Sequence, residues 1–486
     1  TYVVESPHEK GVIWTGADDG LVHVTRDDGK NWENVTPSDL GIGIVNAIDV
    51  SPHDPATAYL AVTRHKLGDH TPLIYRTKDY GKTWKQLADG LPKDGHFVRV
   101  VREDPVRKDL LFAGTESGIF YSVDGGDKWE SLQLNLPCVG ISDLLLHRDD
   151  LVVATRGRAF WVLDNITPLR EMNQDTAKAK VHLFSPTTAY KLKSRIGGKS
   201  GATLYYSLLE DDEDLKIEFL LEGKVVRSFD KSSAGKKPEG KAGLNTFSWR
   251  FDDDEKTPKI DKMYAGRPVS APALPTGTYV VRVSAHEETS EGELSVKMDP
   301  RLEISDEDVQ AQYALSQKSF SMVEELMYSI KSMRDIKDQV EGQLAPLKRA
   351  DKLKDHQELA EASEKLLKAI QAWEESLHDK RRTNGQNIIT YPEMLAEDMT
   401  SILGVVNRAL PPLTQGMLDR FQQVEARWKE KAKERDAIVA NELAAYTKAY
   451  KAANVAVVEV MSFTKPPKKK KDPETKDAKK QKSGTN

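Results

Sequence analysis

Three copies of one eight-residue pattern constrain the fold of this chain more than any other feature of its sequence. Residues 25–32 read Thr-Arg-Asp-Asp-Gly-Lys-Asn-Trp, residues 77–84 read Thr-Lys-Asp-Tyr-Gly-Lys-Thr-Trp, and residues 122–129 read Ser-Val-Asp-Gly-Gly-Asp-Lys-Trp. Each fits hydroxyl-x-Asp-x-Gly-x-x-Trp, and the first Asp recurs after 52 and then 45 residues. A motif that returns after about 40–50 residues is typical of a repeat architecture, and β-propeller blades have this length.

The residue types of this octamer suit a tight turn rather than a reaction. The hydroxyl and the carboxylate can bond to N–H groups of their own turn, and Gly permits the positive φ that such a turn needs. The Trp begins the next strand and is expected to pack between neighbouring sheets. We therefore predict a structural role for all twelve residues: Thr25, Asp27, Gly29, Trp32, Thr77, Asp79, Gly81, Trp84, Ser122, Asp124, Gly126 and Trp129.

Each repeat reads as strand, turn, strand, octamer and short strand, with alternating apolar residues that favour strands. A fourth, degenerate copy runs through residues 151–165, where Leu-Asp-Asn replaces the octamer. The sequence thus predicts three to four blades, whereas propellers close with about four to eight. Because an open propeller leaves sheet edges exposed, the missing blades are expected upstream in a parent protein or on another chain.

The three octamers resemble the Asp-box, also called the bacterial neuraminidase repeat, of sialidases, sortilin-type receptors and xyloglucan-cutting glycosidases. Taken whole, the chain looks like the C-terminal portion of large bacterial sortilin-like propeller proteins. The resemblance implies a propeller whose octamers lie away from the ligand, in a periplasmic or extracellular bacterial protein. It also implies the arginine triad and the Tyr–Glu pair of sialidases, but neither can be matched here, so no catalytic residue is carried over.

Two different patterns follow the repeats. Short alternating strands, among them one that places Phe247, Trp249 and Phe251 on one face, predict a small β-sandwich. The Gly-Lys-Val-Val-Arg hairpin at 223–227 and the Pro-x-Gly-x-Tyr-x-Val-Arg strand at 275–282 resemble immunoglobulin-like modules of bacterial secreted proteins. At Ser305 the apolar period changes from two to 3.6, which predicts a helical bundle with breaks at Pro346, at residues 381–385 and at Pro411–Pro412. The predicted division is residues 1–172 (partial propeller), 173–303 (sandwich), 304–460 (helices) and 461–486 (disordered Lys-rich tail).

The net charge, the cysteine content and the motifs of the sequence exclude several classes of function or give them no support. The net charge of −5 is too close to balance to imply a nucleic-acid partner for the whole chain, although residues 465–486 carry nine Lys against three acids. The single cysteine, Cys138, permits neither an internal disulfide nor a thiolate metal cluster. Phosphate-binding, dinucleotide and zinc-protease motifs are absent from the sequence, as is an apolar run of about 18–20 residues that could span a membrane. We therefore expect no cofactor, no metal and no transmembrane segment.

The opposite ends of the repeats gather the polar residues that could bind a ligand. In a four-stranded blade the octamer joins strands three and four, so the turns between strands two and three lie on the other face. We call the surface made by these turns the turn face, and such loops are the natural binding surface of a propeller. The predicted binding residues are Asp18, Asp19, Arg64, His65, Asp69, His70, Glu116, Arg156 and Arg158, with Lys66 beside them.

Both signs of charge occur on the turn face, which suits a polar ligand such as a glycan or a peptide. The first hypothesis is a non-enzymatic binding or scaffold protein that holds a protein or glycan partner there. The alternative is a glycoside hydrolase whose two carboxylates, at about 5–5.5 or 6.5–9.5 Å, lie partly outside this chain. A metal at His65, Asp69 and His70, calcium at the acidic stretches 210–214 and 252–255, and an anion at Arg156 and Arg158 are further alternatives to solvated or ion-paired loops.

Overall fold

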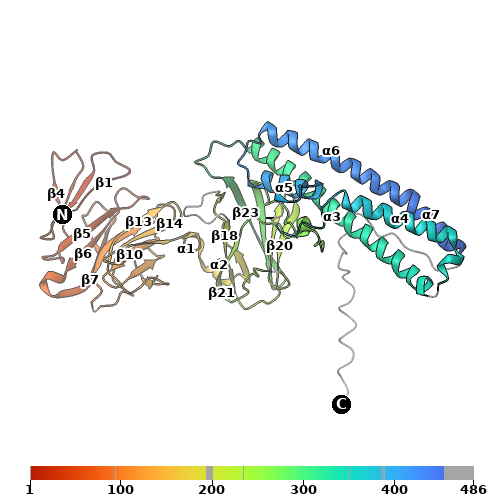
Figure 1. Cartoon of the computed structure of the whole chain (residues 1–486). Helices are drawn as coiled ribbons and strands as arrows, with labels where there is room; N and C mark the ends of the chain where they lie inside the picture. The colour runs from red at the N-terminus through yellow and green to blue at the C-terminus, as the bar shows by residue number, and fades with distance from the viewer. Residues whose placement is uncertain are drawn as a thin grey trace, which may run out of the picture.

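The computed structural model describes residues 2–93, 95–192, 201–233, 235–349, 351–384, 386 and 389–453. Figure 1 shows three regions in chain order: small β-sheets at the N-terminal end, a second group of strands in the middle and long helices at the C-terminal end. The predicted tail, residues 461–486, lies outside the described residues. Among the described residues, every helix is too short or too polar to cross a lipid bilayer.

Four small antiparallel sheets make up the first region, and each contains consecutive strands in chain order. The first sheet consists of β1 (Tyr2–Glu5), β2 (Ile13–Gly16), β3 (Val22–Thr25) and β4 (Glu33–Asn34); the second of β5 (Ile44–Val50), β6 (Ala58–Arg64), β7 (Asp69–Thr77) and β8 (Lys85–Gln86); the third of β9 (Val98–Glu103), β10 (Leu111–Thr115), β11 (Ile119–Ser122) and β12 (Glu130–Ser131); the fourth of β13 (Ile141–His147), β14 (Asp150–Thr155) and β15 (Phe160–Leu163).

The first strands of the four sheets lie next to one another, because β1 contacts β5, β5 contacts β9 and β9 contacts β13. One apolar core fills the space between the first and second sheets, and another extends over the second, third and fourth. Successive four-stranded sheets that pack face to face around their first strands are the blades of a β-propeller. The predicted propeller-type repeat is therefore confirmed; the described part of the chain contains three four-stranded sheets of this kind and a fourth sheet of three strands.

Arg102 of β9 lies where all four sheets meet. Its guanidinium donates to the Tyr2 hydroxyl of the first sheet at 3.1 Å and to the main-chain oxygen of Leu144 in the fourth sheet at 3.1 Å. It forms ion pairs with Asp49 of the second sheet at 3.6 Å and with Asp143 of the fourth at 2.8 Å. One side chain thus ties every sheet to the third.

Two short helices, α1 (Thr167–Glu171) and α2 (Gln174–Lys178), lead into two sheets that share one core. One sheet has the order β16 (Val181–Leu183), β18 (Ala202–Leu208), β21 (Gly243–Trp249), and the other β17 (Ala189–Lys191), β23 (Glu288–Met298), β22 (Gly277–Ala285), β19 (Lys216–Leu221), β20 (Lys224–Phe229). Phe247, Trp249 and Phe251 are buried together, as their spacing predicts. The strands β17 and β23 are parallel.

Long helices form the third region: α3 (Asp306–Arg349), α4 (Gln357–Glu375), α5 (Leu395–Arg408), α6 (Gln415–Ala437) and α7 (Ala444–Ala452), with a π-helical turn at Ile438–Leu443. The predicted start is confirmed, because the Ser305 hydroxyl accepts the Asp308 N–H at 3.1 Å and caps α3. The predicted break at Pro346 is wrong, since this proline lies inside α3. In the last turn of a helix it removes only one hydrogen bond, the one toward the carbonyl of Gly342.

Candidate binding face

The three octamers form the same hydrogen-bonded turn. In each, the hydroxyl oxygen accepts the Gly N–H at 2.8–2.9 Å and donates to the Asp carboxylate at 2.7–2.9 Å. The same carboxylate accepts the N–H four residues later at 2.9–3.0 Å. The bonds from Asn31 and Thr25 lower the pKa of Asp27 to about 2. Because these groups bond within their own turn, they hold the turn together and leave little capacity for a ligand.

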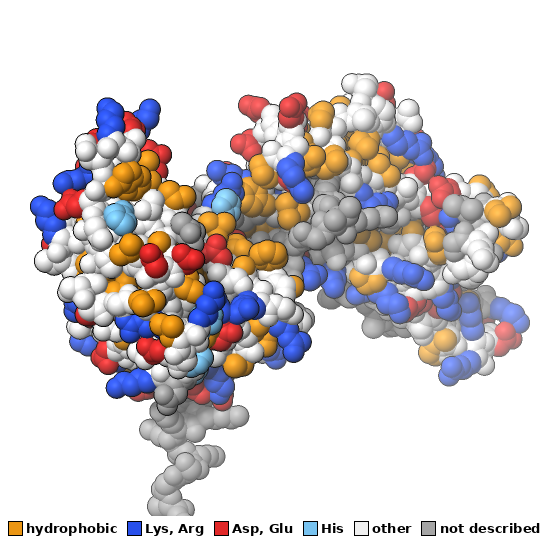
Figure 2. Space-filling view, turned by 90° about the vertical axis from the view of Figure 1, so that its left-hand side faces the viewer, with side chains coloured by type: hydrophobic (Ala, Val, Ile, Leu, Met, Phe, Trp, Pro, Cys, Tyr) orange, Lys and Arg blue, Asp and Glu red, His pale blue; other side chains and the backbone are white. Residues whose placement is uncertain are grey.

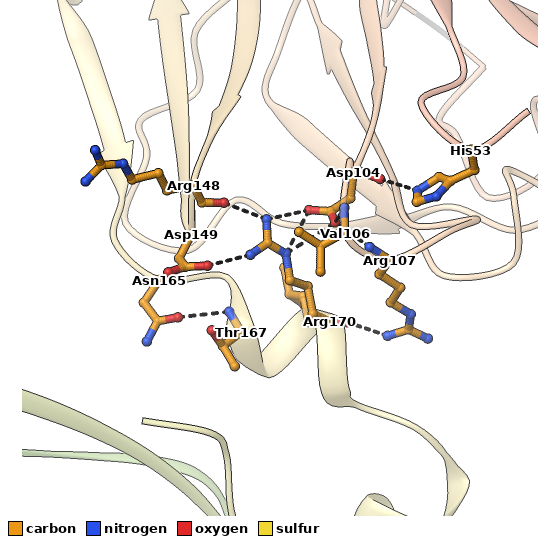
Figure 3. A network of polar contacts seen from close by, with 10 residues as sticks. His53, Asp104, Val106, Arg107, Arg148, Asp149, Asn165, Thr167 and Arg170 are labelled. Atoms are coloured by element: carbon orange, nitrogen blue, oxygen red, sulfur yellow. Dashed lines mark hydrogen bonds and ion pairs between the residues drawn. The ribbon is translucent and has the colours of Figure 1, made fainter. Parts of the chain in front are cut away.

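The octamer end of the four sheets is tied to α1 by a polar network around the buried Arg170 and Asp104 side chains (Figure 3). Arg170 of α1 bonds the Asp104 carboxylate at 2.9 Å, the Asp149 carboxylate at 2.7 Å and the main-chain oxygen of Arg148 at 2.7 Å. The main-chain oxygen of Asp104 is 2.8 Å from the His53 ring. These contacts join the second, third and fourth sheets, so the polar groups at this end of the propeller hold the sheets together.

An aromatic and basic cluster occupies the turn face between the second and third sheets. The His65 ring stacks on Phe97 with centroids 5.0 Å apart and an interplanar angle of 13°, and the His70 ring lies 5.7 Å from the same phenyl group. The Arg99 guanidinium lies over Phe97 at 4.9 Å. Phe97 itself is buried, so it serves as the base on which the two imidazoles and the guanidinium are held.

Glu116 continues this cluster toward the fourth sheet. Its carboxylate pairs with Arg99 of β9 at 3.0 Å and with Arg156, in the turn after β14, at 3.5 Å. Gly140 lies beneath it, because a Cβ added there would be 3.2 Å from the carboxyl group. The Ser117 hydroxyl bonds the His96 ring. Residues from the second, third and fourth sheets are thus in contact along one line of the turn face.

Other predicted binding residues are arranged differently. Arg64 pairs with Asp69 at 3.4 Å within the second sheet, and Asp69 also accepts the Thr71 N–H at 3.0 Å. Asp19 accepts the N–H of Leu21 in its own turn at 3.1 Å. In the described part of the chain, the side chains of Asp18, Asp19 and Arg158 make no contact with the cluster.

Sequence reasoning missed Phe97, Arg99 and His96. They precede or begin the first strand of a blade, not the turn between strands two and three. The only signal is that Phe97 and Arg99 stand two residues apart, which places them on one side of an extended chain. The contact of this side with the turns of two sheets is long-range and has no local signature.

The charge state of the cluster follows from its surroundings. Burial lowers the pKa of His65, and the nearby Arg99 and Lys66 lower it further. Hydrogen bonds from Thr71, with Arg64 beside them, lower the pKa of Asp69. At neutral pH the cluster therefore offers a neutral imidazole beside fixed guanidinium and carboxylate groups. Such a surface can stack on a sugar ring or a peptide side chain and hydrogen-bond its polar groups.

Among the described residues, no three His, Cys, Asp or Glu side chains are grouped so that they could hold a metal ion. The acidic stretches are engaged otherwise: Asp211 pairs with Lys241 at 2.8 Å, Asp214 with Lys231 at 2.6 Å and Asp254 with Arg227 at 2.6 Å.

Comparisons with known proteins give distant likenesses only. No family model and no curated protein sequence matches this chain. Among solved structures, YCF48 from Cyanidioschyzon merolae is 19% identical over 34% of this chain and 52% of its own, with a TM-score of 0.26. The GH74 xyloglucanase from Xanthomonas campestris is 14% identical over 60% and 44%, with a TM-score of 0.27.

The extracellular domain of a putative hybrid two component system from B. thetaiotaomicron is 13% identical over 61% of this chain and 38% of its own, with a TM-score of 0.26. The matches with YCF48 from Cyanidioschyzon merolae, the xyloglucanase and this domain span about half of each of those proteins or less. At these TM-scores the likenesses carry no argument, and the fold rests on the strand order and sheet packing of this chain.

Proposed function

We propose that this chain is a non-enzymatic binding or scaffold protein that holds a protein or glycan partner on its turn face. The observation that carries the proposal is the line of contacts from His65 through Phe97 and Arg99 to Glu116 and Arg156. It joins three blades into one polar and aromatic surface, while the opposite end is used for structure. Rings and charges fixed by one another bind a partner without first having to be ordered.

The geometry favours binding over glycoside hydrolysis. A hydrolase needs one carboxyl group that can donate a proton and a second that is free to act on the substrate or on water. On this face Glu116 is engaged by two guanidinium groups, and Asp69 is engaged by Arg64 and Thr71. These acids anchor the surface. A hydrolase could still arise with carboxylates from outside this chain.

The finer assignments belong to the same proposal. We take the octamers as Asp-boxes of a bacterial sortilin-like protein, the middle region as an immunoglobulin-like sandwich, and the helices as a docking module. The compartment we propose is the periplasm or the cell exterior. Further blades, supplied by a longer parent protein or by another chain, complete the propeller.

Binding and hydrolysis are separated by one set of measurements on the full chain. The immobilised protein is screened against a glycan array and a displayed peptide library, and soluble protein is incubated with xyloglucan to detect new reducing ends. We expect at least one ligand whose affinity falls about tenfold or more in Arg156→Ala, a change of about 1.4 kcal/mol, and no new reducing ends. Arg26→Ala, at the octamer end, is the matched control and should bind normally. Release of reducing ends that Glu116→Gln abolishes would replace this proposal with the hydrolase.

A further inference from the structure

The second octamer shows how two neighbouring blades are joined. A Cβ added to Gly81 would lie 2.6 Å from the Cβ of Val35, so this glycine lets the turn approach the first sheet closely. The Trp84 indole N–H donates to the main-chain oxygen of the same Val35 at 2.7 Å, and its ring packs on Trp14 edge to face at 6.3 Å. Val35 is the first residue after the outermost strand of the first sheet.

The third octamer repeats this junction against the second sheet. A Cβ added to Gly126 would lie 2.6 Å from a methyl group of Leu87, the first residue after the outermost strand of that sheet. The Trp129 main-chain N–H donates to the main-chain oxygen of Asp89 at 2.9 Å, and the Trp129 side chain is buried. In both junctions the octamer glycine closes over an aliphatic residue of the preceding sheet, and the octamer Trp donates to a main-chain oxygen there, through its indole N–H at Trp84 and through its main-chain N–H at Trp129.

The first octamer has the same residues without this partner in the described part of the chain. A Cβ added to Gly29 would meet only its own Trp32 ring, at 3.7 Å. Trp32 is 45% exposed and its indole N–H turns back to the Gly29 oxygen at 3.1 Å. On the same side of the first sheet Val3 is 67% exposed. Figure 2 views the molecule from the side of the four sheets and shows hydrophobic side chains exposed there among charged ones.

We propose that this outer side of the first sheet is the docking site for one further complete blade of the same kind. The blade that binds this site carries an aliphatic residue directly after the outermost strand of that blade. This residue covers Gly29. A main-chain carbonyl of that segment accepts the Trp32 indole N–H, as the Val35 carbonyl accepts that of Trp84. This proposal rests on the proposed completion of the propeller by further blades and deepens it, because it names the surface that receives a blade and the structure of that blade.

A second copy of this chain does not supply that occupant. Its last sheet has three strands in the described residues and no outermost strand. Conversely, Leu145, Phe160 and Val162 leave the outer side of the last sheet apolar and exposed, so that side is suited to a blade as well.

The test adds two further blades to the full chain, copied from this protein, so that the added blade next to the first sheet is one already known to pack against an octamer. A copy of residues 2–97, which holds the first two sheets, is joined directly to Tyr2, so that β1 follows the added second sheet as β9 follows the original one. The added Leu87 then faces Gly29 as the original Leu87 faces Gly126. The signal of Trp32 is isolated by subtracting the fluorescence of the Trp32→Phe variant of each protein.

We expect Trp32 emission to shift to shorter wavelength and its quenching by acrylamide to fall several-fold in the extended protein. The matched control carries Leu87→Asp in the added copy only, and there Trp32 should stay as quenchable as in the parent. If circular dichroism shows the added sheets folded while Trp32 remains fully quenchable, the proposal is wrong. It is also wrong if the parent chain protects Trp32 by itself through a concentration-dependent dimer seen in sedimentation, because the occupant is then a second copy.

Discussion

Asp49 is a carboxylate held at the contact between the second and third sheets. It accepts the Glu103 N–H at 2.8 Å and lies 3.6 Å from the Arg102 guanidinium. Burial raises the pKa of Asp49 to about 6 despite the attraction of Arg102, and the nearby Glu103 and Asp143 add to the rise. The folded protein therefore holds this proton more tightly than the unfolded chain does.

The first prediction concerns the pH dependence of stability that Asp49 causes. Between pH 4 and 6 the folded state binds more protons at this site, so the free energy of unfolding should fall as pH rises through that window, by up to about 3 kcal/mol. Asp49→Asn keeps an acceptor for the Glu103 N–H and cannot titrate. Urea unfolding of both proteins at pH 4–7 should show the variant gaining relative stability up to pH 6; a difference that does not change with pH would contradict the assignment.

Thr77 illustrates how much of an octamer is carried by one oxygen. The side chain is buried, and its Oγ accepts the buried Gly81 N–H at 2.8 Å and donates to Asp79 at 2.8 Å. Thr77→Ala leaves the Gly81 N–H without a partner, which should lower the free energy of unfolding by about 1–3 kcal/mol. Thr77→Ser keeps the oxygen, so it should lower the free energy of unfolding clearly less. Thermal unfolding of both variants and the parent measures the difference. Equal losses would mean that the methyl group, and not the hydroxyl, matters here.

At the residue scale the sequence predicted the turns better than the surface. The octamer contains its own hydrogen-bond partners within five residues, so its conformation can be derived from local spacing. The turn-face cluster cannot, because His65, Phe97 and Arg156 come from three sheets and meet only after those sheets pack. Asp18 and Asp19 were grouped with them by topology alone, and Asp19 accepts a hydrogen bond within its own turn instead.

At the scale of elements, α1 is short but fixes the end of the propeller. Arg170 and Asp104 are 7% and 0% exposed, and the helix contributes no other charge to this network. A deeply buried ion pair adds little net stability, because the cost of taking both charges out of water offsets their attraction. Removing one partner, however, leaves an uncompensated buried charge. The position of α1 therefore depends on Arg170.

The third prediction follows from that dependence. Arg170→Ala should lower the free energy of unfolding by about 3–5 kcal/mol, because Asp104 stays buried without its guanidinium partner. Lys178→Ala, on the exposed side of α2, is the matched control and should change stability by less than about 0.5 kcal/mol. Thermal unfolding followed by circular dichroism measures both. If Arg170→Ala lowered the free energy of unfolding no more than the control, the network in Figure 3 would not hold the sheets together.

Strands were predictable as elements because alternation of apolar residues and Gly-rich turns are local signals. Helix ends were less so: the sequence placed a break at Pro346, yet α3 continues to Arg349. The helix expected over residues 414–453 contains a π-helical turn at Ile438–Leu443, which inserts no proline or glycine and has no sequence signature. The helices α1 and α2 were not expected, since five-residue helices depend on what they pack against.

At the scale of the whole molecule, the middle and C-terminal regions share a core, whereas the buried clusters of the propeller contain, among the described residues, only residues of the propeller and of α1. Ile260 and Met263, from the middle region, are buried in the core of the helices. Arg334 of α3 donates to the main-chain oxygen of Asp261 at 2.6 Å. Between the propeller and the middle region the contacts include the Tyr205 hydroxyl on the Asp164 main-chain oxygen at 3.2 Å.

This sharing could not be predicted from the sequence. The change of period at Ser305 marks where the helices begin. The burial of Ile260 and Met263 in their core is a contact across about 70 residues of chain, as the bond from Arg334 to Asp261 shows. The boundary at residue 303 therefore separates patterns in the sequence, and the two regions on either side of it are expected to unfold together.

The fourth prediction tests that coupling. Met263→Ala removes a buried side chain from the helical core and should cost about 2–5 kcal/mol. Because the residue belongs to the middle region and its contacts to the helices, hydrogen exchange should quicken in both α3 and β21. The octamer turns of the propeller should exchange at the original rate, since their core contains no residue of either region. Val3→Ala, on the exposed side of the first sheet, is the control and should alter neither. Faster exchange in the helices alone would show that the middle region folds without them.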